Sequence, residues 1–264
     1  MQDGAVSEQL PVRISNPDGA SPYIFICEHA SNRLPAQFGT LGLAAGEMDS
    51  HIAWDPGALP VARILASALG AALVESTVSR LVIDCNRPLD APDLIPALSE
   101  NTVVPSNENL SPADQEARVT LSWRPFHDAM SGLVDRRLKA GRETRLVSVH
   151  SFTPTYKGVA RPWQVGVLHD DDTRLSAPLI TALRELGRFT IGDNQPYSPA
   201  DRVYFTLERH ARSRALPCAM IEIRNDEIRD AAGQSRWGEL LGDIFLHLEP
   251  GRHDQPARRQ RAGS

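Results

Sequence analysis

Seven short apolar runs constrain the fold more than any other feature of this sequence. Each is five or six residues long, and several are rich in β-branched residues, which is typical of buried strands. Runs that are apolar on both faces predict a sheet covered on both sides. The expected strands span residues 23–27, 71–76, 80–84, 145–150, 164–169, 188–192 and 218–223.

Helix start signals lie between these runs. A capping side chain precedes a proline at Asp55-Pro56, at Ser111-Pro112 and at Ser198-Pro199, and each pair opens a segment with helical patterning. Strands that alternate with helices predict an α/β fold around a largely parallel or mixed sheet.

The length of the chain favours one domain. Its 264 residues are 41% hydrophobic, which is enough to bury a sizeable core. We expect an N-terminal extension at 1–20, a single catalytic domain at 21–249 and a disordered tail at 250–264. Residues 97–112 read as a long surface loop, of the kind that often borders a site.

Composition excludes several kinds of partner. The net charge is −5 and the basic residues are scattered until the tail, so we expect no nucleic-acid partner. No apolar run approaches the roughly 20 residues of a membrane span, and the N-terminus lacks an export signal. The three cysteines, Cys27, Cys85 and Cys218, are few and far apart, which predicts buried thiols in a reducing compartment. A cytoplasmic protein with no membrane partner is expected; its oligomeric state stays open.

Ionisable and polar side chains gather where the expected strands end. In such sheets, ligands bind at the carboxyl ends of the strands. The side chains found there are His29, Asn86, Arg87, His150, Glu222 and Arg224.

These residue types suit metal-assisted hydrolysis. Two histidines and one oxygen ligand commonly hold a catalytic zinc, and a nearby carboxylate then acts as general base. His29 and His150 fit the ligands and Glu222 fits the base. Arg87 and Arg224 could bind a substrate carboxylate through two parallel N–H groups. Arg80 could stabilise the negative charge that forms on the carbonyl oxygen during the reaction. The pattern favours cleavage of an amide in a small acidic substrate.

At these residues the chain resembles the N-formylglutamate amidohydrolase family. The segments that carry the resemblance are "CEHASNRLP", "HIAWDPGALP", "SRLVIDCNRP", "VSVHSFTP" and "HARSRALPCAMIEIRND", within residues 21–230. The resemblance implies hydrolysis of N-formyl-L-glutamate to formate and glutamate, a late step in histidine breakdown. A divergent member could act on another acyl group or amino acid.

A more distant resemblance joins the chain to the zinc carboxypeptidases and aspartoacylase. It implies a three-layer α/β/α sandwich of the phosphorylase/hydrolase type with one zinc ion. It also implies that His29 and His150 bind the metal, that Asn86 and Arg87 hold a substrate carboxylate, and that Glu222 is the base.

The third metal ligand is left open by the sequence. The wider superfamily has His-x-x-Glu, but here Asn32 follows His29 by three residues. Asp55 is the first choice, although it also suits a helix cap. Glu28, the Asn32 carbonyl oxygen and His51 are the alternatives.

Some residues receive weaker assignments. His210 is a candidate substrate contact on a helix, and Asp84 a brace for Arg80 or Arg87. His127 and His169 are expected at the surface. A metallopeptidase-like hydrolase and a non-catalytic binder of acidic ligands remain the rival functions.

Overall fold

A seven-stranded mixed sheet forms the centre of the protein in the computed structural model, which describes residues 10–44 and 46–249. The strand order is β1-β3-β2-β6-β11-β9-β10, and β3, β2, β6 and β11 run parallel to one another. The strands are β1 (Val12–Ser15), β2 (Tyr23–Cys27), β3 (Ala72–Ser76), β6 (Arg145–Phe152), β9 (Val165–Leu168), β10 (Ile191–Asp193) and β11 (Cys218–Arg224). β1 pairs antiparallel with β3, and β9 pairs antiparallel with β11.

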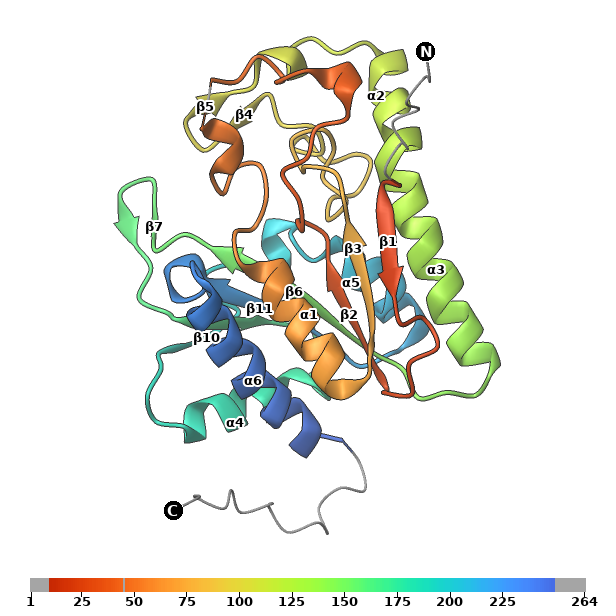
Figure 1. The fold of residues 1–264 in the computed structure, drawn as a ribbon, viewed down its shortest axis with the longest axis vertical. Coiled ribbons are helices and arrows are strands. Elements are labelled where there is room, and N and C mark those ends of the chain that lie inside the picture. The colour runs from red at the N-terminus through yellow and green to blue at the C-terminus, as the bar shows by residue number, and fades with distance from the viewer. Residues whose placement is uncertain (1–9, 45, 250–264) are drawn as a thin grey trace, which may run out of the picture.

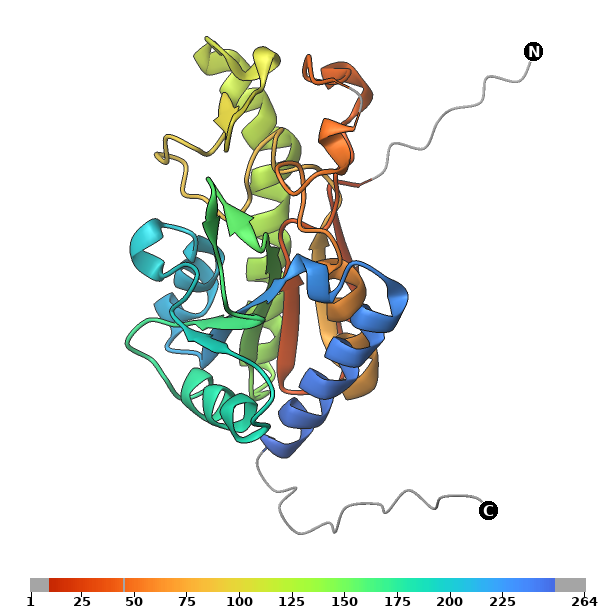
Figure 2. The same cartoon turned by 90° about the vertical axis from the view of Figure 1, so that its left-hand side faces the viewer.

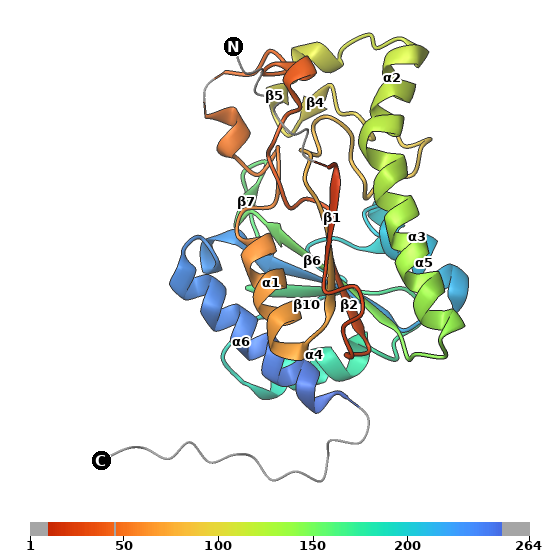
Figure 3. The same cartoon turned by 45° about the vertical axis from the view of Figure 1, so that its right-hand side comes forward.

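Helices cover both faces of this sheet, as Figure 1 and Figure 3 show. One layer contains α1, α4 and α6, and the other contains α3 and α5. The α-helices are α1 (Ala58–Leu69), α2 (Pro112–Arg118), α3 (Arg124–Lys139), α4 (Ser176–Glu185), α5 (Phe205–His210) and α6 (Ala231–His247). The expected three-layer α/β/α fold is confirmed.

The alternation of side chains along β11 shows how each strand serves both layers. Ala219, Ile221 and Ile223 pack with α1 and α6, whereas Cys218 and Met220 pack with α3 and α5. Glu222 lies on the same face of the strand as Met220. It is near the carboxyl end of β11, where a cavity and not a helix lies against the sheet.

Loops above the sheet form a third apolar cluster, and this corrects one expectation. Residues 80–84 form turns and not a strand, because Leu81, Val82 and Ile83 are buried in that cluster with Trp123 and Val104. The run is apolar because it fills a loop core away from the sheet.

Two hairpins lie beside these loops. β4 (Leu98–Ser99) pairs with β5 (Thr102–Val103), and β7 (Thr155–Tyr156) pairs with β8 (Val159–Ala160). Figure 2 shows the β7–β8 hairpin projecting from β6 towards the loops above the sheet. The segment 97–112, expected as a loop, therefore carries a short hairpin and a 3₁₀ turn at Pro105–Asn107.

The helix starts differ from expectation at two of three places. Ser111 caps α2 as expected. Ser198 begins only a 3₁₀ turn, Pro199–Asp201, because Arg202 takes a left-handed conformation (φ 59°), and α5 starts later. At α1 the cap position is Gly57, and Asp55 makes no capping bond.

The described residues before position 20 take part in the sheet. β1 lies inside the expected N-terminal extension and forms an edge of the sheet. The expected tail, 250–264, lies outside the described residues. Within the described ranges, no helix combines the length and apolarity needed to cross a bilayer. The three cysteines are free and buried, as expected.

Candidate active site

A cavity of about 540 Å³ opens at the carboxyl ends of β2, β6 and β11. Its lining includes most of the residues that the sequence singled out: His29, Asp55, Arg80, Asp84, Asn86, Arg87, His150 and Glu222. These residues come from five separated segments, which parallel pairing brings to one edge of the sheet.

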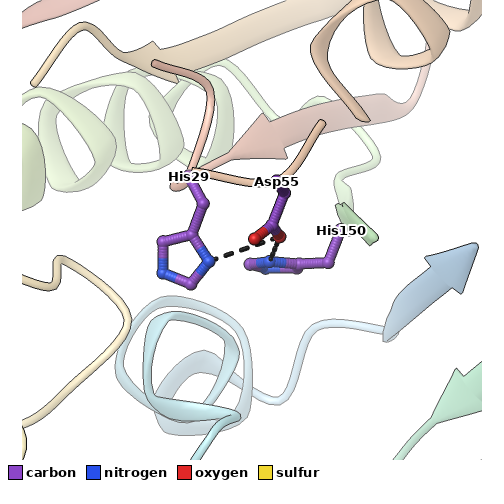
Figure 4. A group of neighbouring side chains, drawn as sticks. All are labelled: His29, Asp55 and His150. Carbon is purple, nitrogen blue, oxygen red and sulfur yellow. Dashed lines mark hydrogen bonds and ion pairs between the residues drawn. The ribbon is translucent and has the colours of Figure 1, made fainter. Parts of the chain in front are cut away.

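Asp55 lies between the rings of His29 and His150 (Figure 4). Its Oδ2 atom is 2.7 Å from His150 Nδ1 and 3.3 Å from His29 Nδ1. One ligand atom from each of the three residues lies within 4.8 Å of the others, and all three residues are buried. Two nitrogens and one carboxylate oxygen form a donor set that suits a catalytic zinc. Of the four candidates for the third ligand, Asp55 is the one that the structure brings between the histidines.

The local backbone fixes Asp55 in this position. Its N–H donates to the carbonyl of His29 (2.9 Å), so the segment before α1 is joined to the end of β2. Gly57 follows with φ 82°, where a Cβ atom would also meet the Ile228 carbonyl at 2.3 Å. This turn frees the Asp55 carboxylate from the helix start and directs it to the histidines.

A carboxylate lies on the far side of each ring: Asp84 hydrogen-bonds to His29, whereas Glu28 makes an ion-pair contact with His150. His29 Nε2 lies 2.7 Å from Asp84 Oδ1, and His150 Nε2 lies 3.1 Å from Glu28 Oε2. The 2.7 Å contact with Asp55 is a hydrogen bond donated by a protonated His150 Nδ1, and a metal ion bound to this nitrogen would replace that proton. Glu28 also accepts from Ser148 Oγ (2.6 Å), so its Oε2 is already engaged on the side of His150 that faces away from Asp55.

The electrostatics of the cluster are dominated by opposite charges in contact. Burial opposes ionisation, but the nearby histidines lower the pKa of Asp55, and Arg80 lowers that of Asp84 well below its usual range. Burial likewise opposes the charge on His150, yet Glu28 and Asp55 raise its pKa well above the ordinary value. Without a cation, a proton on His150 balances the two carboxylates.

Arg80 is held against this cluster. Its Nη2 donates to Asp84 Oδ2 (2.7 Å), and its Nη1 lies 3.3 Å from His29 Nδ1 and 3.7 Å from Asp55 Oδ1. Asp84 therefore braces Arg80, as the sequence suggested, and it also contacts His29.

No ion pair in the described part of the chain includes the carboxylate of Glu222, which lines the cavity. Its Oε2 is buried and has no hydrogen-bond partner among the described residues, and burial raises its pKa to about 7. It pairs in register with His150 on the neighbouring strand, so it faces the same cavity. A carboxyl group that exchanges its proton near neutral pH suits a general base.

The two remaining candidates for the third ligand are engaged with other partners. The Asn32 amide donates to the Met48 carbonyl (2.9 Å), and Asn32 does not line the cavity. His51 lines the cavity but pairs with Glu100, with 2.8 Å between Nε2 and Oε2.

Of the residues expected to bind a substrate carboxylate, Arg87 and Asn86 line the cavity and Arg224 does not. Arg87 lines the cavity and donates through Nε to Asp93 (2.8 Å). Asn86 lines it too, but its amide donates to the Val203 carbonyl and accepts from Thr206 N–H, so it anchors the start of α5. Arg224 lies outside the lining and pairs with Asp226 (2.7 Å).

The structure also places His210 outside the cavity lining. His210 is buried against His127, with 2.8 Å between His210 Nε2 and His127 Nδ1, and His127 Nε2 contacts the Cys85 carbonyl. The expectation that His127 lies at the surface is wrong, because α3 and α5 bury the pair between them.

The cavity lining also includes Arg161, Tyr156 and Tyr197, which were not assigned to binding from the sequence. Arg161 stands in no motif, and its relation to the site depends on the β7–β8 hairpin and on the turn before Ser198. The sequence signal for Tyr197 is the turn "NQPYSP" around it, because surface turns of this kind often border a site.

Comparison with known proteins agrees with this geometry. The family model for N-formylglutamate amidohydrolase matches residues 21–229. The chain belongs to the N-formylglutamate amidohydrolase family. No match is found among curated proteins.

Several chains of solved structures resemble this member of the N-formylglutamate amidohydrolase family. The gene product Atu2144 from Agrobacterium tumefaciens is 40% identical, with a TM-score of 0.89 over 91% of this chain and 95% of that one. An N-formylglutamate amidohydrolase from Ralstonia eutropha JMP134 is 20% identical, with a TM-score of 0.61 over 91% and 97% of the two chains. The second likeness is one of fold.

Proposed function

We propose that this protein is a zinc-dependent amidohydrolase that cleaves N-formyl-L-glutamate to formate and glutamate. The observation that carries the proposal is the cluster of His29, Asp55 and His150 in one cavity with the buried carboxylate of Glu222. Family membership supplies the reaction class. The acidic, N-acylated substrate and the cytoplasmic location remain parts of the proposal.

The donor set fits a divalent cation. Both Nδ1 atoms and the Asp55 carboxylate converge, while Asp84 and Glu28 occupy the opposite nitrogens of the rings. Zinc bound there would act as a Lewis acid and lower the pKa of a water molecule towards neutrality. His29, Asp55 and His150 are the residues that would hold it.

Proton transfer falls to Glu222. Its burial and raised pKa allow it to accept a proton from the attacking water near neutral pH and then to donate that proton to the leaving nitrogen. Because its Oε2 has no partner among the described side chains and backbone groups, the carboxylate is free to bind the water.

Arg80 is placed to stabilise the developing negative charge. Its guanidinium is fixed by Asp84 at one edge and directs its other terminal nitrogen into the cluster. A donor already oriented before the reaction stabilises an oxyanion without reorganisation during the reaction. The negative charge on the carbonyl oxygen would lie against this nitrogen.

Metal content and formate release test the proposal together. We expect about one zinc ion per chain, formate release from N-formyl-L-glutamate, loss of activity on chelation and recovery with added zinc. His150→Ala should lose both metal and activity. His169→Ala, at a histidine paired with Asp193 outside the cavity lining, is the matched control and should retain both.

Each other outcome has a defined meaning. Zinc without formate release would remove the substrate assignment and favour another N-acyl amino acid or a peptide amide. A protein that binds no metal after zinc addition would contradict the catalytic proposal and favour a binding protein for acidic ligands.

A further inference from the structure

The arginines of the cavity differ in whether a carboxylate already neutralises them. Arg80 pairs with Asp84 at 2.7 Å, and Arg87 pairs with Asp93 at 2.8 Å. Arg161 lines the same cavity, and no ion pair in the described part of the chain includes it. One cationic side chain of the cavity therefore lacks an anionic partner.

Arg161 is held by aromatic faces. Its Cζ atom lies 4.7 Å from the ring centroid of Tyr156 and 4.7 Å from that of Tyr197, with Phe152 at 5.7 Å. Stacking of this kind fixes the plane of a guanidinium and leaves the N–H groups on its edge available. The Arg161 Nη1 donates to Thr153 Oγ1 (3.4 Å), and the guanidinium also interacts with the Tyr197 hydroxyl. These contacts use few of the five N–H donors of the guanidinium.

Burial makes the missing anion significant. Arg161 is 9% exposed, and burying a cation without a compensating charge is costly. Its backbone N–H donates to the Pro154 carbonyl (2.8 Å), which ties the residue to the base of the β7–β8 hairpin. The side chain is thus pre-positioned at the cavity wall at an energetic cost that an anionic ligand would offset.

We propose that Arg161 binds a carboxylate of the substrate, with Tyr156 and Tyr197 clamping its guanidinium. The inference rests on the proposed function and adds to it a specificity residue that the sequence motifs do not contain. A planar guanidinium presents two parallel N–H groups that match the two oxygens of a carboxylate. The ligand class is therefore a small molecule with a free carboxylate.

The other candidates for this role are already engaged. The Asn86 amide is used on both sides by the segment 203–206, and Arg224 is paired outside the cavity. Arg87 has a carboxylate partner in Asp93. Among the cations that line the cavity, Arg161 gains most from a substrate carboxylate.

A substrate panel tests Arg161 directly. We would measure kcat/KM for N-formyl-L-glutamate and for its two monoamides, at the side chain and at the α-carboxyl, with wild type, Arg161→Gln and Arg161→Lys. Arg161→Gln should lower kcat/KM for the diacid by about 10- to 100-fold and should hardly affect the monoamide that lacks the bound carboxylate. Arg161→Lys should be intermediate, because it keeps the charge and loses the planar fork.

The matched control is Arg188→Gln. Arg188 also stacks on an aromatic ring, with its Cζ 5.1 Å from the Phe189 centroid, but it is exposed and lies outside the cavity lining. Its replacement should leave all three kcat/KM values unchanged. A purely structural role for Arg161 would lower all three values together, and that result, or an unchanged preference in Arg161→Gln, would overturn the inference.

Calorimetric binding separates this inference from the proposed function. L-Glutamate and N-formyl-L-glutamate should bind wild type and Arg188→Gln, and should bind Arg161→Gln at least 10-fold more weakly. If wild type releases no formate but shows this difference in binding, the proposed reaction falls and the carboxylate site stands. If formate is released and binding is equal in all variants, the reaction stands and the assignment of Arg161 fails.

Discussion

At the scale of single residues, Glu222 carries a carboxylate in surroundings that oppose its charge. Replacement by glutamine keeps the shape of the side chain and removes the proton acceptor. Glu222→Gln should lower kcat by about 10²- to 10⁴-fold, the usual contribution of a general base, while zinc content stays at the wild-type value. Formate release and metal analysis on the same preparations would check this.

Glu239→Gln serves as the control for that change. Glu239 is exposed on α6 and does not line the cavity, so its variant should match wild type in both measurements. A Glu222→Gln enzyme within a fewfold of wild-type kcat would show that another group moves the proton.

Single residues also show what the sequence could predict. His29, His150 and Glu222 were identified because each is polar at the end of an apolar run, and this local contrast survives in the structure. Arg161 could not be identified in this way. Its isolation from carboxylates and its stacking on Tyr197 depend on segments that only tertiary structure brings together.

At the scale of elements, Glu100 joins the two hairpins at the cavity. It lies in the turn between β4 and β5, where its Oε1 accepts from the Lys157 N–H of the β7–β8 turn (3.3 Å) and its Oε2 pairs with His51 (2.8 Å). One side chain thus links three segments that are far apart in the sequence.

Removing this link should loosen the hairpins without touching the catalytic cluster. Glu100→Ala should raise KM by about two- to fivefold and leave kcat unchanged, because a partly exposed ion pair contributes up to about 1 kcal/mol. Steady-state kinetics would be compared with hydrogen exchange at residues 98–103 and 155–160. Exposed Glu108→Ala is the control, and unchanged exchange in both hairpins of Glu100→Ala would contradict the linking role.

The sequence patterns predicted the central strands of the sheet correctly. β2, β6 and β11 are recognised because strands in the middle of a covered sheet must be apolar on both faces. Residues 80–84 have the same composition for a different reason, since they fill the loop cluster around Trp123. An apolar run reports burial, and it does not report which partner buries it.

At the scale of the whole molecule, stability depends on pH through the buried histidine pair between α3 and α5. Burial lowers the pKa of both His127 and His210 to about 3, whereas an unfolded histidine titrates near 6.5. Between these values the unfolded chain binds protons that the folded protein excludes. The stability from neutral burial is therefore fully present above pH 6.5 and is lost as the pH falls towards 3.

His127→Gln removes one of these titrations and keeps a donor for the Cys85 carbonyl. The variant should lose some stability at pH 8 but show a shallower decline below pH 6.5, with a slope in the free energy of unfolding reduced by up to about 1.4 kcal/mol per pH unit. Urea unfolding of wild type and variant from pH 8 to pH 4.5 would measure it. If the His127→Gln curve is parallel to wild type, His127 takes up its proton as readily in the folded protein as in the unfolded chain, and acid instability must come from other groups.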